Sequence, residues 1–460
     1  MVIGAICLVV FLGLALIARP LGHDESVYAL GSDFDPMRIH RPVGMHVLAA
    51  LGALPGHPEL GFRIVAALGT TAFVIASWCY ARRAFDTTVA TWTAAVVGGS
   101  FALLHRSSEL LSDAPAGALI LVVAMLLSEG LAHRDRQPAV HWKLAAIGPA
   151  TAAAFYLRYG SIIIVAALGA AAAVAFRRQL WAQRGPLLAA IASMLVLAIP
   201  HVIHSVGATG SPLGIIKAGG AMAGRPLQGV VFYSTTWWYW LLPAAAVCVA
   251  SGCIAAVIRP FRDRRSREIV LFTGLGAALA LAVLGIVAHG EARYAYVPQA
   301  LLTSSGIAML RALHRGRAGE RDRGWLRGVV IVVVAATAVG GVAGAVWTLV
   351  RAGERLASIA DAGELIRADA AGRPCKVASS RWAQVGWYSG CEPLDSELGV
   401  APDAIDGVSY LVWFDRAPRQ WTAVLDRLRM GADGVKATEW RRVEHGRDRG
   451  ATLYRLSRVR

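Results

Sequence analysis

The chain has 460 residues, of which 56% are apolar and only 17% are charged, whereas about 25% of the residues in an ordinary soluble protein are charged. Its mean hydropathy is +0.51 and its formal net charge is +16. This composition excludes a disordered chain and argues against a typical soluble domain. A basic excess is typical of proteins that bind nucleic acid or an anionic membrane surface. The positions of the charges in the sequence decide between these two partners.

About eleven stretches are apolar and long enough to cross a bilayer as helices, since the hydrocarbon core is about 30 Å thick and needs about 20 residues. They lie near residues 2–18, 62–80, 87–104, 114–131, 144–157, 160–176, 186–204, 237–258, 269–288, 295–310 and 328–350. The first stretch has no basic residues ahead of it and no small-residue cleavage site before Arg19, so we expect it to be retained and not removed as a signal peptide. The sequence therefore predicts a mostly α, polytopic membrane protein with about 11 transmembrane helices.

The basic residues gather in every second loop, near residues 82–83, 134–143, 177–184, 259–267 and 311–327. Loops rich in arginine and lysine remain on the cytoplasmic side. We therefore expect an integral plasma (inner) membrane protein with a cytoplasmic N-terminus and its C-terminal part outside. Membrane orientation then accounts for the positive net charge, and nucleic acid is not an expected partner.

The polar C-terminal part predicts a small extracytoplasmic α/β domain over 351–460, following a transmembrane module over 1–350. Short strands are expected at 375–378 and 410–414, and helices at 354–370 and 418–430. Cys375 and Cys391 fall in this domain. An oxidising compartment permits a disulfide between them, and the alternative is two free thiols.

Ionisable residues on the predicted outer side lie beside apolar stretches, where charge is costly and indicates function. The first outer loop, 19–61, begins with the pair Asp24 and Glu25. Its later part has Arg41 before Pro42 and then an apolar run, 43–54, which is too short to span and is expected to lie in the membrane interface. Three further loops add Glu109 and Asp113, then Arg158 and Tyr159, then Arg293 and Tyr294.

Carboxylates and arginines at one membrane level suit group transfer from a membrane-anchored phosphate. A carboxylate can take a proton from a nucleophile within hydrogen-bond distance, and guanidinium groups bind phosphate oxygens in pairs. The sequence has neither a Walker A loop nor a dinucleotide-binding glycine pattern. The expected donor is therefore a lipid phosphate, and these side chains are expected to enclose one site.

The arrangement resembles the GT-C superfamily of membrane glycosyltransferases, nearest to its protein O-mannosyltransferase and lipid A aminoarabinose transferase branch. The matching stretches are His23-Asp24-Glu25-Ser26-Val27-Tyr28-Ala29, His40-Arg41-Pro42, Gly61-Phe62-Arg63-Ile64-Val65, residues 109–115, Leu157-Arg158-Tyr159-Gly160, and Arg293-Tyr294 with Pro298. Two positions depart from the family pattern: Val43 stands where relatives often have a second proline, and Arg158 where many have lysine.

The resemblance implies transfer of a sugar from a polyprenyl-phosphate-linked donor to an extracytoplasmic lipid, glycan or protein, with inversion in one displacement. By position, Asp24 would be the base and Glu25 would support it. Arg158 and Arg293 would lie near the donor phosphate, and Glu109 and Asp113 would line the acceptor or sugar side.

Structural roles compete with these functional ones. Asp24, Glu109 and Asp113 could each cap a helix, and Glu25 could be structural. Arg41 could bind either the donor phosphate or lipid headgroups. No cofactor is required by this chemistry. A divalent metal is conceivable, but among the outer histidines only His201 and His204 have a ligand-like spacing.

Two other functions are compatible with a polytopic chain. A transporter or lipid flippase would place its binding groups near the middle of the bilayer, whereas here the charges lie at the outer edge. A non-catalytic scaffold that presents residues 351–460 would need neither Asp24 nor Arg158.

Overall fold

The computed structural model describes residues 2–17, 19–30, 42–53, 56–132, 140–221, 227–258, 261–288, 290–317, 320–394, 407–415, 419–430, 435–444 and 450–458. The chain forms two compact units. The first, here called the helical unit, comprises Met1–Leu16, Pro36–Gly52 and Arg63–Val346. The second, here called the sheet unit, comprises Ile17–Asp35, Ala53–Phe62 and Trp347–Arg460. The sheet unit thus includes two short segments from the first outer loop besides the C-terminal part.

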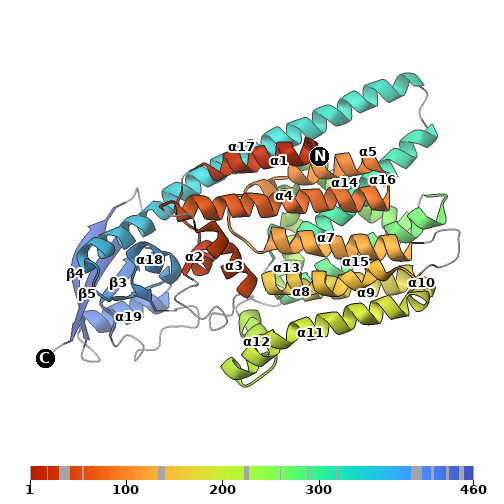
Figure 1. Ribbon diagram of the computed structural model, residues 1–460. Coiled ribbons are helices and arrows are strands. Elements are labelled where there is room, and N and C mark those ends of the chain that lie inside the picture. The colour runs from red at the N-terminus through yellow and green to blue at the C-terminus, as the bar shows by residue number, and fades with distance from the viewer. Residues whose placement is uncertain are drawn as a thin grey trace. The chain divides into compact units, whose positions relative to one another are not determined.

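The helical unit is a bundle in which helices distant in sequence pack side by side (Figure 1). Helix α14 packs against α16, α9 against α15, and α8 against both α7 and α11. Its elements are α1 (Val2–Ala15), α3 (Val43–Gly52), α5 (Thr87–Gly98), α6 (Phe101–Leu104), α7 (Asp113–Leu131), the 3-10 helix η2 (Trp142–Ala146), α8 (Ile147–Leu157), α9 (Ser161–Ala175), α10 (Arg177–Ala182), α11 (Arg184–Thr209), α12 (Gly214–Ala221), α13 (Gln228–Val231), the π-helix η3 (Phe232–Thr236), α14 (Trp237–Ile258), α15 (Arg264–Val287), the 3-10 helix η4 (Ala292–Ala295) and α16 (Tyr296–Arg317). Two helices belong to both units: α4 (Pro58–Ala84) is part of the sheet unit up to Phe62, and α17 (Glu320–Ala370) is part of it from Trp347.

Every stretch expected to cross the membrane contains helix. Among the described residues, six helices are long and apolar enough to span a bilayer: Pro58–Ala84, Asp113–Leu131, Arg184–Thr209, Gln228–Ile258, Arg264–Val287 and Gly328–Ala370. The helices α1, α3 and α9 are apolar but shorter. Helix α11 exposes a row of large apolar side chains, including Leu188, Leu195 and Ile203, as expected of a surface that faces lipid. The mostly helical membrane fold is thus confirmed, while the number of spans stays a prediction.

The expected stretches 144–157 and 160–176 are two separate helices. Helix α8 ends at Leu157, because Arg158 adopts an extended backbone with φ −158° and ψ 115°, and α9 begins at Ser161. The polar Arg158-Tyr159-Gly160 segment therefore forms a turn between two apolar helices.

The sheet unit contains a five-stranded sheet of order β2-β1-β3-β5-β4. Its strands are β1 (Lys376–Ser379), β2 (Glu392–Pro393), β3 (Tyr410–Phe414), β4 (Val435–Val443) and β5 (Ala451–Arg458). Strand β1 runs parallel to β2 and β3, and β5 runs antiparallel to β3 and β4. The strands at 376–379 and 410–414 lie where the sequence predicts them.

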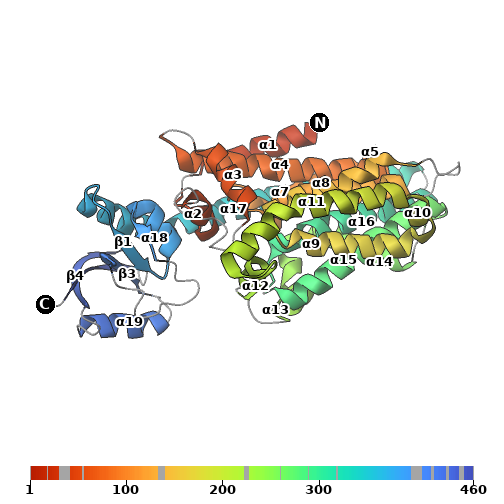
Figure 2. The same cartoon turned by 60° about the horizontal axis from the view of Figure 1, so that its bottom comes forward.

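Helices cover both faces of this sheet, because successive side chains of a strand point to opposite faces. Tyr410 and Val412 pack with the C-terminal part of α17. Leu411 packs with Leu425 and Leu428 of α19 (Arg419–Arg429). Figure 2 shows α19 on one side of the sheet and α18 (Trp382–Ser389) on the other.

A disulfide joins Cys375 and Cys391, whose Cα atoms lie 4.9 Å apart. It closes a loop that contains β1 and α18, with a sequence separation of 16. Closing a loop of this length stabilises the folded state by about 3 kcal/mol, because the cross-link reduces the entropy of the unfolded chain. The disulfide therefore joins the residue before β1 to the residue two positions after α18.

We expect Cys375 and Cys391 to resist alkylation until the protein is reduced. Peptide mass spectrometry after alkylation, with and without prior reduction, measures this directly. Alkylation of both cysteines in unreduced protein would contradict the bridge.

Candidate active site

The Asp24–Glu25 pair begins a short helix, α2 (His23–Ala29), in the sheet unit. Acidic residues are favourable in a first turn because they face the positive end of the helix dipole. The carboxylate of Glu25 accepts the N–H of Gly22 at 2.7 Å. This contact fixes where the helix begins.

Glu25 is also the partner of a buried arginine that the sequence analysis did not consider. Arg19 donates from Nη1 and Nη2 to the two carboxylate oxygens of Glu25, at 2.9 and 3.2 Å, and both side chains are 1% exposed. Both carboxylate oxygens of Glu25 are therefore bound by Arg19, whereas Asp24, beside it, is only partly buried.

In the helical unit, the structure brings together three of the predicted outer segments. Asp113 opens α7, Arg158 ends α8, and Arg293 lies in η4 just before α16. The guanidinium of Arg158 forms an ion pair with Asp113. Arg293 pairs with Glu291, and its Nε lies 3.8 Å from Oδ2 of Asp113. We call Arg106, Glu109, Asp113, Arg158, Glu291, Arg293 and Tyr294 the rim cluster.

Tyr294 binds both arginines of this group through its ring. The guanidinium carbon of Arg158 lies 4.4 Å from the ring centroid, and that of Arg293 lies 5.3 Å from it, which is cation–π distance. The ring thus holds two cations close to one carboxylate. Tyr159 packs differently, against Phe155 and His201 with centroids 5.1 and 5.0 Å away.

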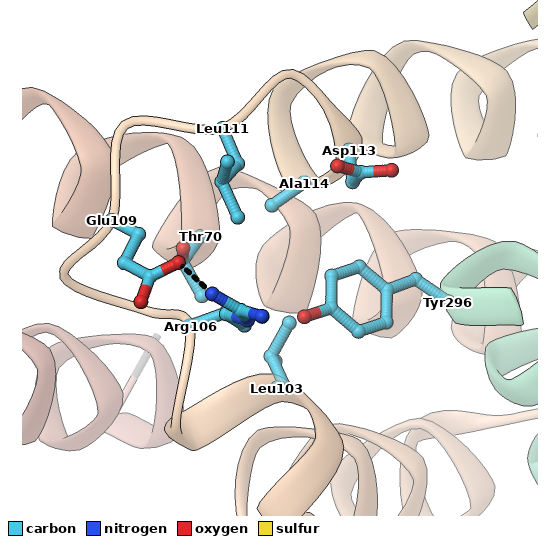
Figure 3. Close-up of a pocket in the computed structure, with 8 residues that line it drawn as sticks. All are labelled: Thr70, Leu103, Arg106, Glu109, Leu111, Asp113, Ala114 and Tyr296. Atoms are coloured by element: carbon cyan, nitrogen blue, oxygen red, sulfur yellow. Dashed lines mark hydrogen bonds and ion pairs between the residues drawn. The ribbon is translucent and has the colours of Figure 1, made fainter. Parts of the chain in front are cut away.

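A small pocket adjoins the rim cluster (Figure 3) and has room for about one water molecule, with a volume of about 10 Å³. Glu109 forms an ion pair with Arg106 at one side of it, and Asp113 and Tyr296 lie at the other. The pocket is lined by Thr70, Leu103, Arg106, Glu109, Leu111, Asp113, Ala114 and Tyr296. As it stands, the pocket is too small to hold a sugar.

Arg106 is a member of the rim cluster that was not predicted from the sequence. The signal was present, because Arg106 lies three residues before Glu109 and residues at this spacing can pair along a helical turn. The loop between α6 and α7 follows such turns, since Glu109 N–H bonds to the carbonyl of Arg106 at 3.0 Å.

His105 contributes no charge to this loop at neutral pH. Burial, and then the neighbouring Arg106, lower the pKa of His105 to about 4. Its ring packs against Phe101 and Trp240, with centroids 5.0 and 4.8 Å away. The positive charge of the loop therefore belongs to Arg106.

The other predicted site residues stand as follows. Arg41 lies outside the described residues. Asp24 and Glu25 belong to the sheet unit, whereas Glu109, Asp113, Arg158, Arg293 and Tyr294 belong to the helical unit. Within the described ranges, no three histidine, cysteine or carboxylate side chains are grouped to hold a metal ion, so a metal requirement stays untested.

The fold and part of the sequence are similar to those of known glycosyltransferases. Residues 39–204 match the family model described as dolichyl-phosphate-mannose-protein mannosyltransferase. A comparison with curated proteins gave no match.

Solved structures resemble the chain over nearly its whole length. ArnT from Cupriavidus metallidurans bound to undecaprenyl phosphate has a TM-score of 0.71 at 15% identity and covers 99% of this chain and 97% of its own. The apo state of the same protein has a TM-score of 0.70 at 17% identity, with the same coverage of both chains. The Archaeoglobus fulgidus oligosaccharyltransferase tethered to an acceptor peptide gives 0.62 at 12% identity, covering 92% of this chain and 70% of its own. The resemblance to GT-C glycosyltransferases expected from the sequence is thereby confirmed, and the fold is of that kind.

Proposed function

We propose that this protein transfers a sugar from a polyprenyl-phosphate-linked donor to an acceptor outside the cytoplasm. The observation that carries the proposal is the rim cluster, where Arg158 and Arg293 share Asp113 and the ring of Tyr294. Two guanidinium groups held side by side suit the oxygens of a phosphate. A GT-C-type fold similar to a transferase bound to undecaprenyl phosphate supports the same reading.

In this proposal the donor is cleaved at its anomeric carbon. An acceptor hydroxyl attacks C1 of the sugar, and the bond between C1 and the phosphate oxygen breaks. Polyprenyl phosphate leaves with that electron pair, and Arg158 and Arg293 stabilise its charge. Asp24 takes the proton of the attacking hydroxyl. A single displacement of this kind inverts the anomeric centre.

The test is a transfer assay with purified protein in liposomes. Labelled polyprenyl phosphates carrying mannose, an arabinose-type sugar or a glucose-type sugar are supplied with extracts of envelope lipids, glycans and proteins. We expect label to move from one donor to one acceptor class, with release of polyprenyl phosphate. A lipid flippase would move the donor across the bilayer with its sugar bond intact, and that result would overturn the proposal.

The proposed orientation places the loop before α17 inside the cell and the sheet unit outside. In a variant whose four cysteines Cys7, Cys79, Cys248 and Cys253 are replaced by alanine, we expect Glu320→Cys to react only with membrane-permeant reagents in intact cells. Met430→Cys, whose position is 77% exposed, should react with impermeant reagents. The opposite labelling pattern would contradict the orientation.

A further inference from the structure

Helix α18 is almost wholly buried, although it belongs to a small, polar part of the chain. Its buried residues are Trp382, Ala383, Gln384, Val385, Gly386, Tyr388 and Ser389. The disulfide of Cys391 follows immediately. A helix that is buried and followed by a disulfide in this way has little freedom to move within the sheet unit.

One hydroxyl of α18 joins both ends of the first outer loop. The Tyr388 oxygen accepts the N–H of Leu21 at 2.7 Å, and its own O–H donates to Oε1 of Glu59 at 2.8 Å. Leu21 lies two residues before α2, and Glu59 lies in the first turn of α4. Burial, and then the charge of Glu59, raise the pKa of Tyr388 above its usual range, so the hydroxyl remains a donor at physiological pH.

Aromatic contacts reinforce the same junction. The ring of His23 meets Trp382 edge-on, with centroids 5.7 Å apart. Phe62 packs on Trp387 at 5.8 Å. Helix α18 therefore touches the first residue of α2 as well as the residue that precedes its cap.

Helix α2 depends on such contacts because it has only seven residues. Isolated helices shorter than about 12 residues are marginal in water, since nucleation is unfavourable. Asp24 lies between His23, which Trp382 contacts, and Glu25, which Arg19 holds. The backbone of Asp24 is thus held on both sides.

We propose that Tyr388 is a positioning residue for Asp24 within the sheet unit. This rests on the proposed function, in which Asp24 takes the proton of the acceptor. An error of about 1 Å in a reacting group can cost about 100-fold in rate. A loss of position should therefore lower kcat, while donor binding by the arginines of the helical unit should be unaffected.

The variant Tyr388→Phe tests this, because it removes the hydroxyl and keeps the ring. We expect kcat to fall about 10- to 100-fold with the KM for the lipid-linked donor unchanged. Hydrogen exchange should become faster at the amides of residues 21–29. The exchange measurement needs no activity, so it tests the positioning separately from the proposed function.

Tyr410→Phe is the matched control. Tyr410 is a buried tyrosine of the same unit, and its hydroxyl donates to Asp369 at 2.7 Å on the other side of the sheet from α19. We expect this variant to keep kcat within about twofold and to leave exchange at 21–29 as it is in the wild type.

Two results would overturn the inference. One is an active wild type whose Tyr388→Phe variant keeps full kcat and unchanged exchange at 21–29. The other is an equal fall of kcat in both variants, which would mean general loosening of the sheet unit. A wild type that cleaves none of the donors would instead overturn the proposed function, and faster exchange in Tyr388→Phe would still support the contact with α2.

Discussion

Asp24→Asn is expected to abolish sugar transfer while leaving the protein folded and inserted in the membrane. Asparagine has nearly the same shape as aspartate but cannot take a proton, and loss of a general base costs about 100- to 10,000-fold in rate. The buried pair of Arg19 and Glu25 is unaffected, so α2 should keep its place. The measurement is the initial rate of label transfer in proteoliposomes at saturating donor.

Glu25→Gln provides the contrast, because the neighbouring carboxylate is buried and paired. Removing one charge from such a pair costs about 3–5 kcal/mol of folding free energy. We therefore expect Glu25→Gln to lower the thermal unfolding temperature, and Asp24→Asn to leave it unchanged. Wild-type rates in the Asp24→Asn variant would remove Asp24 from the mechanism.

The second large effect is expected from Arg158→Gln. A hydrogen bond to a charged group contributes about 1.5–3 kcal/mol, so losing a two-pronged contact to phosphate should raise the KM for the donor at least about 10-fold. Arg158→Lys should lose less, since lysine keeps the charge but not the paired geometry. The KM is measured by varying the lipid-linked donor.

Part of any rise in KM in Arg158→Gln could come from Asp113. Its side chain is 4% exposed and would lose an ion-pair partner. The double variant Arg158→Gln with Asp113→Asn separates the two causes. If Arg158 binds phosphate, the double variant should keep a raised KM for the donor even if its stability returns to that of the wild type. Recovery of the wild-type KM would show that Arg158 only neutralises Asp113.

Arg83→Ala is the control for arginine removal in general. Arg83 pairs with Glu129 at 3.2 Å, and its side chain is 58% exposed. Exposed pairs of this kind contribute about 0–1 kcal/mol. This variant should leave both the KM and the unfolding temperature as they are in the wild type.

Local sequence features predicted much of the fold. Hydropathy located the helices, and the polar interruption at Arg158 located the turn between α8 and α9. Two helix boundaries differ: the expected stretch 87–104 is divided into α5 and α6, and the expected span at 328–350 and the expected helix at 354–370 form one continuous helix, α17. The intervening residues, such as Ala352, Glu354 and Arg355, are good helix formers with no proline among them.

The sequence predicted site residues only where charged side chains lie next to the ends of apolar stretches. Outer loops with paired charges indicated Asp113, Arg158 and Arg293, which the structure groups together. The contact of Tyr388 with Leu21 joins residues 367 positions apart, and no local pattern encodes such a pairing. Arg19 was overlooked because an arginine at the end of an apolar stretch usually reaches for water, whereas here it is buried.

The ion pairs of the rim cluster bear on how long the proposed lipid phosphate would stay bound. The three arginines of the cluster already face carboxylates, in the pairs of Arg106 with Glu109, Arg158 with Asp113 and Arg293 with Glu291. In the proposed reaction an incoming phosphate would compete with these carboxylates for guanidinium hydrogens, of which each arginine has five. The net affinity for the phosphate would then be a difference between two similar attractions, and this would favour rapid release of the polyprenyl phosphate over tight binding.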